Sequence, residues 1–297
     1  MPARVFPQLR KAVSDLNPNQ VRSAAERYPA IRVVAAGEAG YRAIETFLTA
    51  PRASEERRLE QSLVLHRIGD PAAPTDFDLE IYETGLAKPD QAFAFDPQHP
   101  DRLVEEVLAR REELGLALAR MFPPFRRRVT TQVIATISKE NALIAIASAL
   151  PNIAPGLHLL PWAVTEMTSD TALVTANQIR MLFLLAAASD REIGYRAQRG
   201  EIASVIAAAF GWRALARQLA GKIPLGAGLI PKAAIAYAGT WVVGSSAERY
   251  YRIGFGYTRQ ERRELFREAY ERGRALARHL AEAIRTGRGR ALEGAKP

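Results

Sequence analysis

The hydrophobic positions of this chain are concentrated between residues 141 and 247, in four long segments with very little charge. These segments, rich in Ala, Leu and Ile, are residues 142–164, 172–189, 202–210 and 231–247. Each is too apolar to be stable alone in water, so they are expected to pack against one another, to enter a bilayer, or both. The pattern predicts a block of helices in the C-terminal part of the chain.

The first apolar segment is long enough to span a bilayer, but prolines interrupt it. Residues 141–165 carry no formal charge over 25 positions and contain Pro151, Pro155 and Pro161. A span with three prolines leaves backbone groups unsatisfied unless neighbouring helices cover them. Integral insertion, interfacial insertion and a helical bundle in water therefore remain open.

The second apolar segment is predicted to be a helix that begins at Asp170, ends near Ala188 and has polar residues inside it. These polar residues are Asn177, Gln178 and Arg180. A charge in such a helix requires a partner, and the candidates are Glu166, Asp170 and Glu201. Helix capping and neutralisation of Arg180 are plainer roles for Glu166 and Asp170 than acid–base catalysis.

The last apolar helix is predicted from Pro231 to about Ala247, after a loop rich in Pro and Gly that Lys222 and Lys232 flank. Small residues recur in this helix at four-residue intervals, at Ala236, Thr240 and Gly244. Small side chains at this spacing allow two helix backbones to approach closely, in lipid or in a tightly packed core.

An amphipathic helix is predicted after a link at residues 254–256. Thr258 and Glu261 are spaced as a capping box. The apolar face consists of Leu265, Phe266, Ala269, Tyr270, Leu276, Leu280 and Ile284. Between residues 248 and 290 there are twelve Arg and six Glu. This helix is expected either to pack against the apolar block or to lie on an anionic membrane surface.

The N-terminal part shows short apolar runs instead of long ones. Residues 77–83 alternate apolar and polar side chains, which is typical of a strand with one face in water. The expected strands are residues 31–36, 62–68, 77–83 and 91–95. A helix at 41–50 is expected to end at Pro51, and residues 51–58 to form a solvated connection. Two short helices over 7–28 precede this region, the second starting at Asn17-Pro18.

A strand, a glycine-containing loop and a helix in this order resemble the start of many nucleotide-binding domains. A phosphate-binding loop, however, needs Lys and a Ser or Thr beside its glycines. The loop at 37–44 reads GEAGYRAI and places Glu38 where a phosphate would bind. The stretch AKPD at 87–90 lacks the Asn of a guanine-reading motif. We therefore expect a degenerate domain kept for its shape, without nucleotide hydrolysis.

Between these two parts, the apolar spacing predicts one long helix over residues 101–128, ended by Pro123-Pro124. The basic cluster at 126–128 is either a solvated helix boundary or a contact for lipid phosphates.

Composition and charge narrow the choice of function. The net charge is +9, and 35 of the 41 basic residues are Arg. Such an excess suits nucleic acid or anionic lipid, although Ala and Arg are enriched along the whole chain and the charge then reflects composition alone. The absence of Cys excludes disulfides and thiol chemistry. The four His are scattered without metal-ligand spacing, and the N-terminus lacks a signal-like apolar run, which favours the cytoplasmic side.

The central pattern resembles the YcjF-type domain family over about residues 130–255. The residues that carry this resemblance are Thr175, Gln178, Arg180, Met181, Pro224, Gly226, Gly228, Gly239 and Thr240. The family is bacterial, helical and functionally uncharacterised, is often predicted to associate with membranes, and often occurs beside small GTPase-like domains. The resemblance implies that residues 31–96 are a GTPase-like remnant, and it implies no enzyme activity.

We therefore predict a mostly α, α+β protein, with N-terminal helices at 1–29, a small α/β domain at 30–100, a connecting helix at 101–129, an all-α domain at 130–285 and a tail at 286–297. The expected function is a non-enzymatic, membrane-associated adaptor or regulator on the cytoplasmic side, peripheral or integral, with no cofactor. Its expected partners are inner-membrane lipid or a membrane protein. Self-association is compatible with this expectation, and no specific binding of nucleic acid is expected. The alternative is a soluble, cytoplasmic helical module that binds a protein such as a GTPase, and a divergent nucleotide-dependent enzyme comes last. The structural or interaction candidates are Asp170, Asn177, Gln178, Arg180, Lys222, Lys232, Gly239, Thr240 and Gly244.

Overall fold

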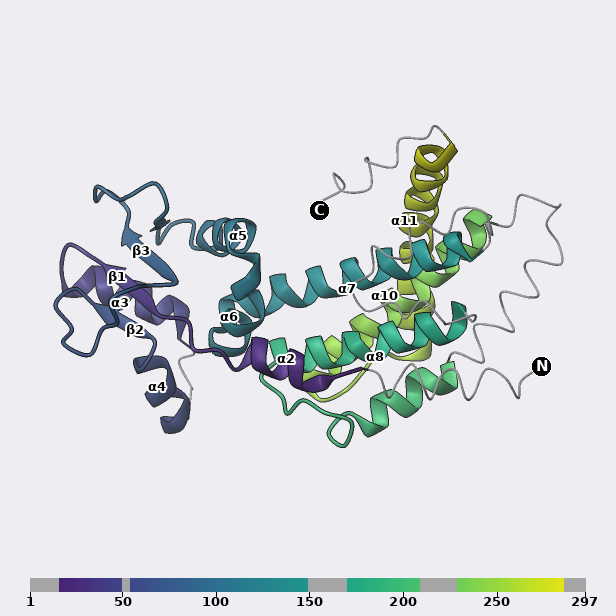
Figure 1. Cartoon of the computed structure of the whole chain (residues 1–297), viewed down its shortest axis with the longest axis horizontal. Coiled ribbons are helices and arrows are strands. Elements are labelled where there is room, and N and C mark those ends of the chain that lie inside the picture. Colours follow the sequence, from purple (N-terminus) through teal and green to yellow (C-terminus); the bar gives the residue numbers. More distant parts are fainter. Residues whose placement is uncertain (1–15, 50–53, 149–169, 209–228, 286–297) are drawn as a thin grey trace. The chain divides into compact units, whose positions relative to one another are not determined.

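The computed structural model describes residues 16–49, 54–148, 170–208 and 229–285 (Figure 1). It confirms a mostly helical α+β fold with a small four-stranded sheet. The chain divides into two compact units. The sheet unit consists of Asn19–Thr131 and Ala186–Glu192, and the helical unit of the described parts of Gln132–Leu185 and Ile193–Pro297 with residues 16–18.

The sheet unit contains four parallel strands in the order β2-β1-β3-β4. They are β1 (Ile31–Val34), β2 (Leu65–Arg67), β3 (Leu79–Glu83) and β4 (Phe93–Phe95). Ile31 is the register partner of Leu65 in β2 and of Leu79 in β3. The predicted strands are thus confirmed, although each is shorter than the apolar run that predicted it.

Helices lie between β1 and β2 and after β4, whereas turns and bends without a helix join β2 to β3 and β3 to β4. The helix α3 (Glu38–Leu48) packs on β1 and β3, and α5 (Asp101–Arg110) packs on β4. The inner side of α3 consists of Tyr41, Ile44 and Leu48, all buried. Ahead of the sheet, α2 (Pro18–Ala25) begins at the predicted proline, whose missing N–H is not needed at this position.

The expectation of a solvated connection at residues 51–58 is wrong in its second half, because α4 (Glu55–Ser62) begins there. The backbone N–H of Arg57 donates to Ser54 Oγ at 3.2 Å, so Ser54 caps the helix. Two Glu residues in the first turn interact favourably with the helix dipole. The charged composition that suggested a loop is therefore that of a capped surface helix.

The single long helix expected over residues 101–128 is also wrong. The chain forms α5, a short 3₁₀ turn (Glu112–Leu114), α6 (Gly115–Met121) and then α7 (Pro123–Ala147). Pro123-Pro124 ends one helix, as expected, and also begins the next. Proline is well suited to a first helical turn, since no intrahelical bond needs its N–H there.

The helical unit contains most of α7, together with α8 (Asp170–Ala188), a helical segment at 199–208, α10 (Leu229–Ile253) and α11 (Arg259–Arg285). These elements confirm the predicted helices. The proline-rich residues 149–169 and the Pro-Gly loop before residue 229 lie outside the described residues.

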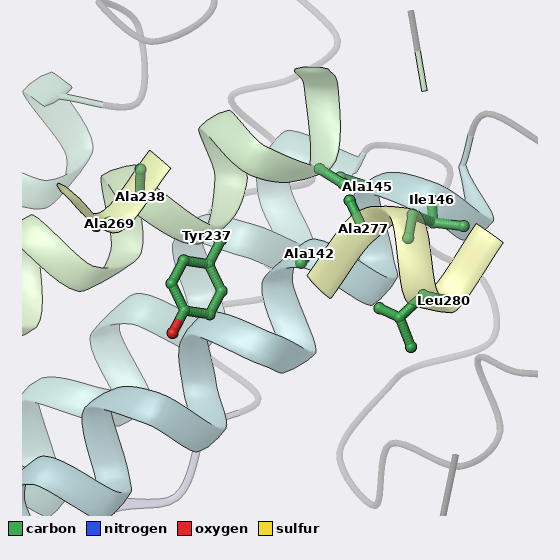
Figure 2. Close-up of a cluster of buried hydrophobic side chains, with 9 residues drawn as sticks. Ala142, Ala145, Ile146, Tyr237, Ala238, Ala269, Ala277 and Leu280 are labelled. Atoms are coloured by element: carbon green, nitrogen blue, oxygen red, sulfur yellow. The ribbon is translucent and has the colours of Figure 1, made fainter. Parts of the chain in front are cut away.

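Small side chains hold α7, α10 and α11 together in a buried cluster. Figure 2 shows Ala145 and Ile146 of α7 beside Ala277 and Leu280 of α11. The Tyr237 ring of α10 belongs to the same cluster and stacks on Trp241 at 5.9 Å between centroids. The amphipathic face predicted for α11 is therefore packed against the apolar helices, which confirms the first of its two interpretations.

Within the helical unit, α10 also approaches α7 and α8 very closely at Gly244. A Cβ added to Gly244 would lie 2.8 Å from Ile134 Cγ1 and 2.9 Å from Met181 Sδ. Only hydrogen fits at such distances, so the predicted close approach at this small residue is confirmed.

Candidate functional site

Four of the predicted site residues form a polar network in the interior of the helical unit. Asn177 and Thr240 are fully buried, and Gln178 is 4% exposed. Gln178 Nε2 on α8 donates to Thr240 Oγ1 on α10 at 3.0 Å. Arg180 Nη2 lies 3.4 Å from Glu140 Oε1 on α7. The network therefore joins three helices that are far apart in the sequence.

The centre of this network is Asn141, which the sequence analysis did not single out. Its Nδ2 donates to Thr240 Oγ1 at 2.8 Å, and its Oδ1 accepts from Asn177 Nδ2 at 2.9 Å. The same amide nitrogen of Asn177 donates to Glu140 Oε2 at 2.9 Å. The signal in the sequence is the placement of Glu140 and Asn141 immediately before a long apolar run, where polar residues are expensive unless paired.

The ion-pair partner identified for Arg180 is Glu140, which was not among the three expected carboxylates. Of those, Glu201 instead lines a pocket described below. Glu166 lies outside the described residues, and of Asp170 only its position at the start of α8 is described. Sequence proximity suggested Glu166 and Asp170, whereas packing of α7 against α8 brings Glu140 close.

The groups of this network are suited to holding helices in place and not to acid–base catalysis. Among the described residues it contains one carboxylate, Glu140, which forms an ion pair with Arg180 and accepts a hydrogen bond from Asn177. A general acid or base needs a titrating group that can reach a substrate. Buried and mutually bonded amides instead fix the alignment of the three helices, since any other alignment leaves buried donors unpaired.

The remaining candidates have separate positions. Lys232 Nζ donates to Ser148 Oγ at 2.8 Å and so joins the start of α10 to the end of α7. Gly239 is buried within α10. Lys222 lies outside the described residues.

A pocket of about 650 Å³ opens on the helical unit between α8, the segment 199–208, α10 and α11. Its wall is mainly apolar, and it includes Leu182, Val205 and Val242, which are buried. The polar residues of the lining are Glu201, Ser204, Ser246, Tyr250, Arg259, Arg262 and Arg263. A concave apolar site with a few polar groups at its edge is the usual form of a small-molecule site.

The last turn of α10 and the link that follows it carry exposed apolar side chains, shortly before these arginines in the chain. Tyr250 is 47% exposed, Ile253 39% and Phe255 62%. We refer to these three residues, together with Arg259, Arg262 and Arg263, as the α10–α11 corner. Exposed aromatic and aliphatic side chains next to Arg are characteristic of surfaces that bind the membrane interface or a partner.

In the sheet unit, the end of α3 that would face a nucleotide is blocked by the protein's own carboxylates. The backbone N–H of Ala36 donates to Glu83 Oε2 at 2.8 Å, and a Cβ on Gly40 would lie 2.2 Å from that oxygen. Glu38 is bonded to Arg67 and Arg42, which lower the pKa of its carboxyl. Glu83 therefore supplies the negative charge that a phosphate would bring to this helix end.

The basic cluster at 126–128 is largely paired within the sheet unit. Arg126 Nη2 lies 3.6 Å from Asp190 Oδ2, and burial lowers the pKa of the Arg126 guanidinium. Arg128 Nη2 lies 2.8 Å from Glu105 Oε1. These contacts favour the helix-boundary interpretation over the lipid-phosphate one.

Two further features of the described residues bear on function. No group of three or more His, Cys, Asp or Glu side chains in these ranges could hold a metal ion. One helix there, Thr171–Ala188 in α8, is long and apolar enough to cross a membrane, and 78% of it is buried inside the protein. Such burial is equally typical of a core helix.

No family model, no curated protein and no solved structure matches this chain.

Proposed function

We propose that this protein is a non-enzymatic, membrane-associated adaptor or regulator on the cytoplasmic side of an inner membrane, in line with its resemblance to the YcjF-type family. The observation that carries this proposal is the α10–α11 corner, where the exposed side chains of Tyr250, Ile253 and Phe255 are followed in the chain by three exposed arginines, which line the pocket together with Tyr250. Aromatic and aliphatic side chains insert into the membrane interface, and Arg is attracted to anionic lipid headgroups.

The mode of association that the helical packing supports is peripheral. The apolar helix α8 carries Asn177, Gln178 and Arg180, whose partners lie on α7 and α10. Moving α8 into lipid would break these bonds and leave a charge unpaired. Surface residues of the corner are free to contact lipid without any such cost.

The absence of enzyme activity is supported by the α3 end of the sheet unit. Glu38 and Glu83 lie there, and like charge disfavours the phosphates of a nucleotide. A degenerate nucleotide-binding shape suits a domain that binds a protein, for which a GTPase remains our partner proposal.

The second candidate is a helical module that binds a protein in water through the same corner. It is favoured by the burial of α8, which gives the helical unit a core without lipid. Exposed Tyr and Arg side chains are also the residues that dominate protein interfaces.

Vesicle sedimentation of the full chain separates these two functions. Vesicles that contain phosphatidylglycerol should bind the protein, vesicles of phosphatidylcholine alone should bind it more weakly, and high salt should release it. The variant Ile253→Ser/Phe255→Ser should reduce the affinity for anionic vesicles by about thirtyfold, since each of the two buried apolar side chains contributes on the order of 1 kcal/mol.

A matched control is Leu59→Ser/Leu63→Ser in the sheet unit, since both leucines are exposed, by 62% and 69%. This control should bind vesicles as the wild type does. Equal loss of binding in the two variants, or no binding of the wild type to anionic vesicles, would refute the membrane proposal and favour the protein-binding module.

A further inference from the structure

The pocket beside α11 combines a deep apolar wall with a cationic edge. Leu182, Val205 and Val242 form buried parts of the wall, and Phe266 of α11 also contributes to it. A volume of about 650 Å³ lies within the range of small-molecule sites. The apolar part therefore fits an extended hydrocarbon group.

The edge of the pocket is formed by Arg259, Arg262 and Arg263, whose side chains are exposed on α11. Within the described ranges, none of the three forms an ion pair. In contrast, the neighbouring Arg249 is bonded to Glu261 at 2.9 Å, and Arg252 to Glu248 at 2.8 Å. Among the lining residues that the structure describes, Glu201 is the only carboxylate, so three positive charges face one negative charge there.

A hydroxyl group in the wall also lacks a partner. Ser246 Oγ is buried and makes no hydrogen bond with any residue that the structure describes. A buried hydroxyl without a partner is unfavourable.

We infer that this pocket binds a single-chain anionic amphiphile, such as a long-chain carboxylate or the single-chain form of an acidic phospholipid. The hydrocarbon chain would lie against Leu182, Val205 and Val242, and the anionic group would contact the three arginines. Guanidinium groups bind carboxylate and phosphate with paired hydrogen bonds. This site goes beyond the proposed membrane association, because a protein can bind a bilayer surface without taking up a lipid molecule.

The inference is tested by titrating the full chain, without vesicles, with 11-(dansylamino)undecanoic acid, whose emission rises when it enters an apolar site. Saturable binding of one probe per chain is expected. Dodecanoate or lauroyl lysophosphatidylglycerol should displace the probe, and the tighter of the two identifies the source as a free acid or a membrane lipid. The neutral dodecanol should displace it far more weakly.

Two pairs of variants connect the binding to this pocket. Ser204→Phe places a ring in the pocket from an exposed lining position and should abolish binding, whereas Ala203→Phe, exposed but outside the lining, should not. Arg262→Gln/Arg263→Gln should weaken binding at least tenfold, because the anionic group loses two of its three guanidinium partners while Arg259 remains. The same change at Arg267 and Arg278, exposed on α11 outside the lining, should have no effect.

The outcomes are distinct from those of the vesicle experiment. Ile253 and Phe255 lie outside the pocket lining. The variant Ile253→Ser/Phe255→Ser should therefore still bind the probe, even though it binds vesicles more weakly. Equal displacement by dodecanol and dodecanoate, equal affinities of the Ser204→Phe and Ala203→Phe proteins, or no saturable binding at all would overturn the inference.

Discussion

Thr240 allows the importance of the polar network to be measured with a change of nearly constant volume. Its hydroxyl oxygen accepts hydrogen bonds from Asn141 Nδ2 at 2.8 Å and from Gln178 Nε2 at 3.0 Å. Thr240→Val keeps the shape of the side chain but removes this acceptor. Two amide donors in a fully buried region then lose a partner, and an unsatisfied buried donor costs about 1–3 kcal/mol.

We therefore expect Thr240→Val to lower the free energy of unfolding by about 2–4 kcal/mol. This corresponds to a decrease of about 3–6 °C in Tm for a protein of this size. Urea denaturation followed by far-UV circular dichroism measures the loss directly, with the m-value checking that the unfolding transition is of the same kind.

Thr175→Val is the matched control. Thr175 is also buried in the helical unit, but its hydroxyl donates only to the backbone carbonyl of Thr171 at 2.7 Å. This change removes one local bond and leaves no side-chain donor unpaired, so a loss of no more than about 1 kcal/mol is expected. If Thr240→Val and Thr175→Val are equally destabilising, the hydrogen bonds from Asn141 and Gln178 to Thr240 do not hold the three helices together.

Two further predictions concern α10 and α11. Gly244→Ala should destabilise the protein by about 1–3 kcal/mol, because its methyl group has no space between the helices, whereas Gly200→Ala, with open space around it, should be neutral or stabilising in the same thermal unfolding assay. The backbone N–H of Thr258 and the side chain of Arg249 lower the pKa of Glu261 from 4.5 to about 2; its stabilisation should thus be present above about pH 4.5 and be lost as the pH falls towards 2. In Glu261→Gln the free energy of unfolding should depend less on pH over this range, whereas Glu264→Gln should behave as the wild type does. Identical pH profiles for the wild type and both variants would contradict the capping box.

The sequence determined the identity of most elements, because their patterns are local. The alternation at residues 77–83 gave β3, and the spacing of apolar residues gave α8, α10 and α11. The capping box was predicted from two residues, and both bonds are present, with Thr258 N–H donating to Glu261 Oε2 at 2.7 Å and Glu261 N–H to Thr258 Oγ1 at 3.3 Å. Such signals depend on neighbours a few residues apart.

The errors arose where local patterns allow two structures. Residues 101–128 have helical spacing throughout, but packing breaks them into α5, a 3₁₀ turn and α6. The charged composition of the stretch before β2 predicts a loop at residues 51–58, whereas Ser54 caps α4 there. Charge and spacing alone do not indicate where the chain turns, since that depends on contacts with other elements.

For the candidate sites, the sequence by itself determined which residues are unusual: a charge and two amides inside an apolar helix, small residues on α10, and a loop without phosphate-binding groups. Only the tertiary structure decided that Glu140 and Asn141 are their partners, that Glu83 occupies the end of α3, and that three arginines border an apolar pocket. The physical reason is that these contacts join positions 36 to 99 residues apart or, for the pocket, elements from α8 to α11. The hydrophobic pattern of a helix determines which of its faces is buried. Which residues contact that face is determined by packing between helices, and this packing exists only in the folded chain.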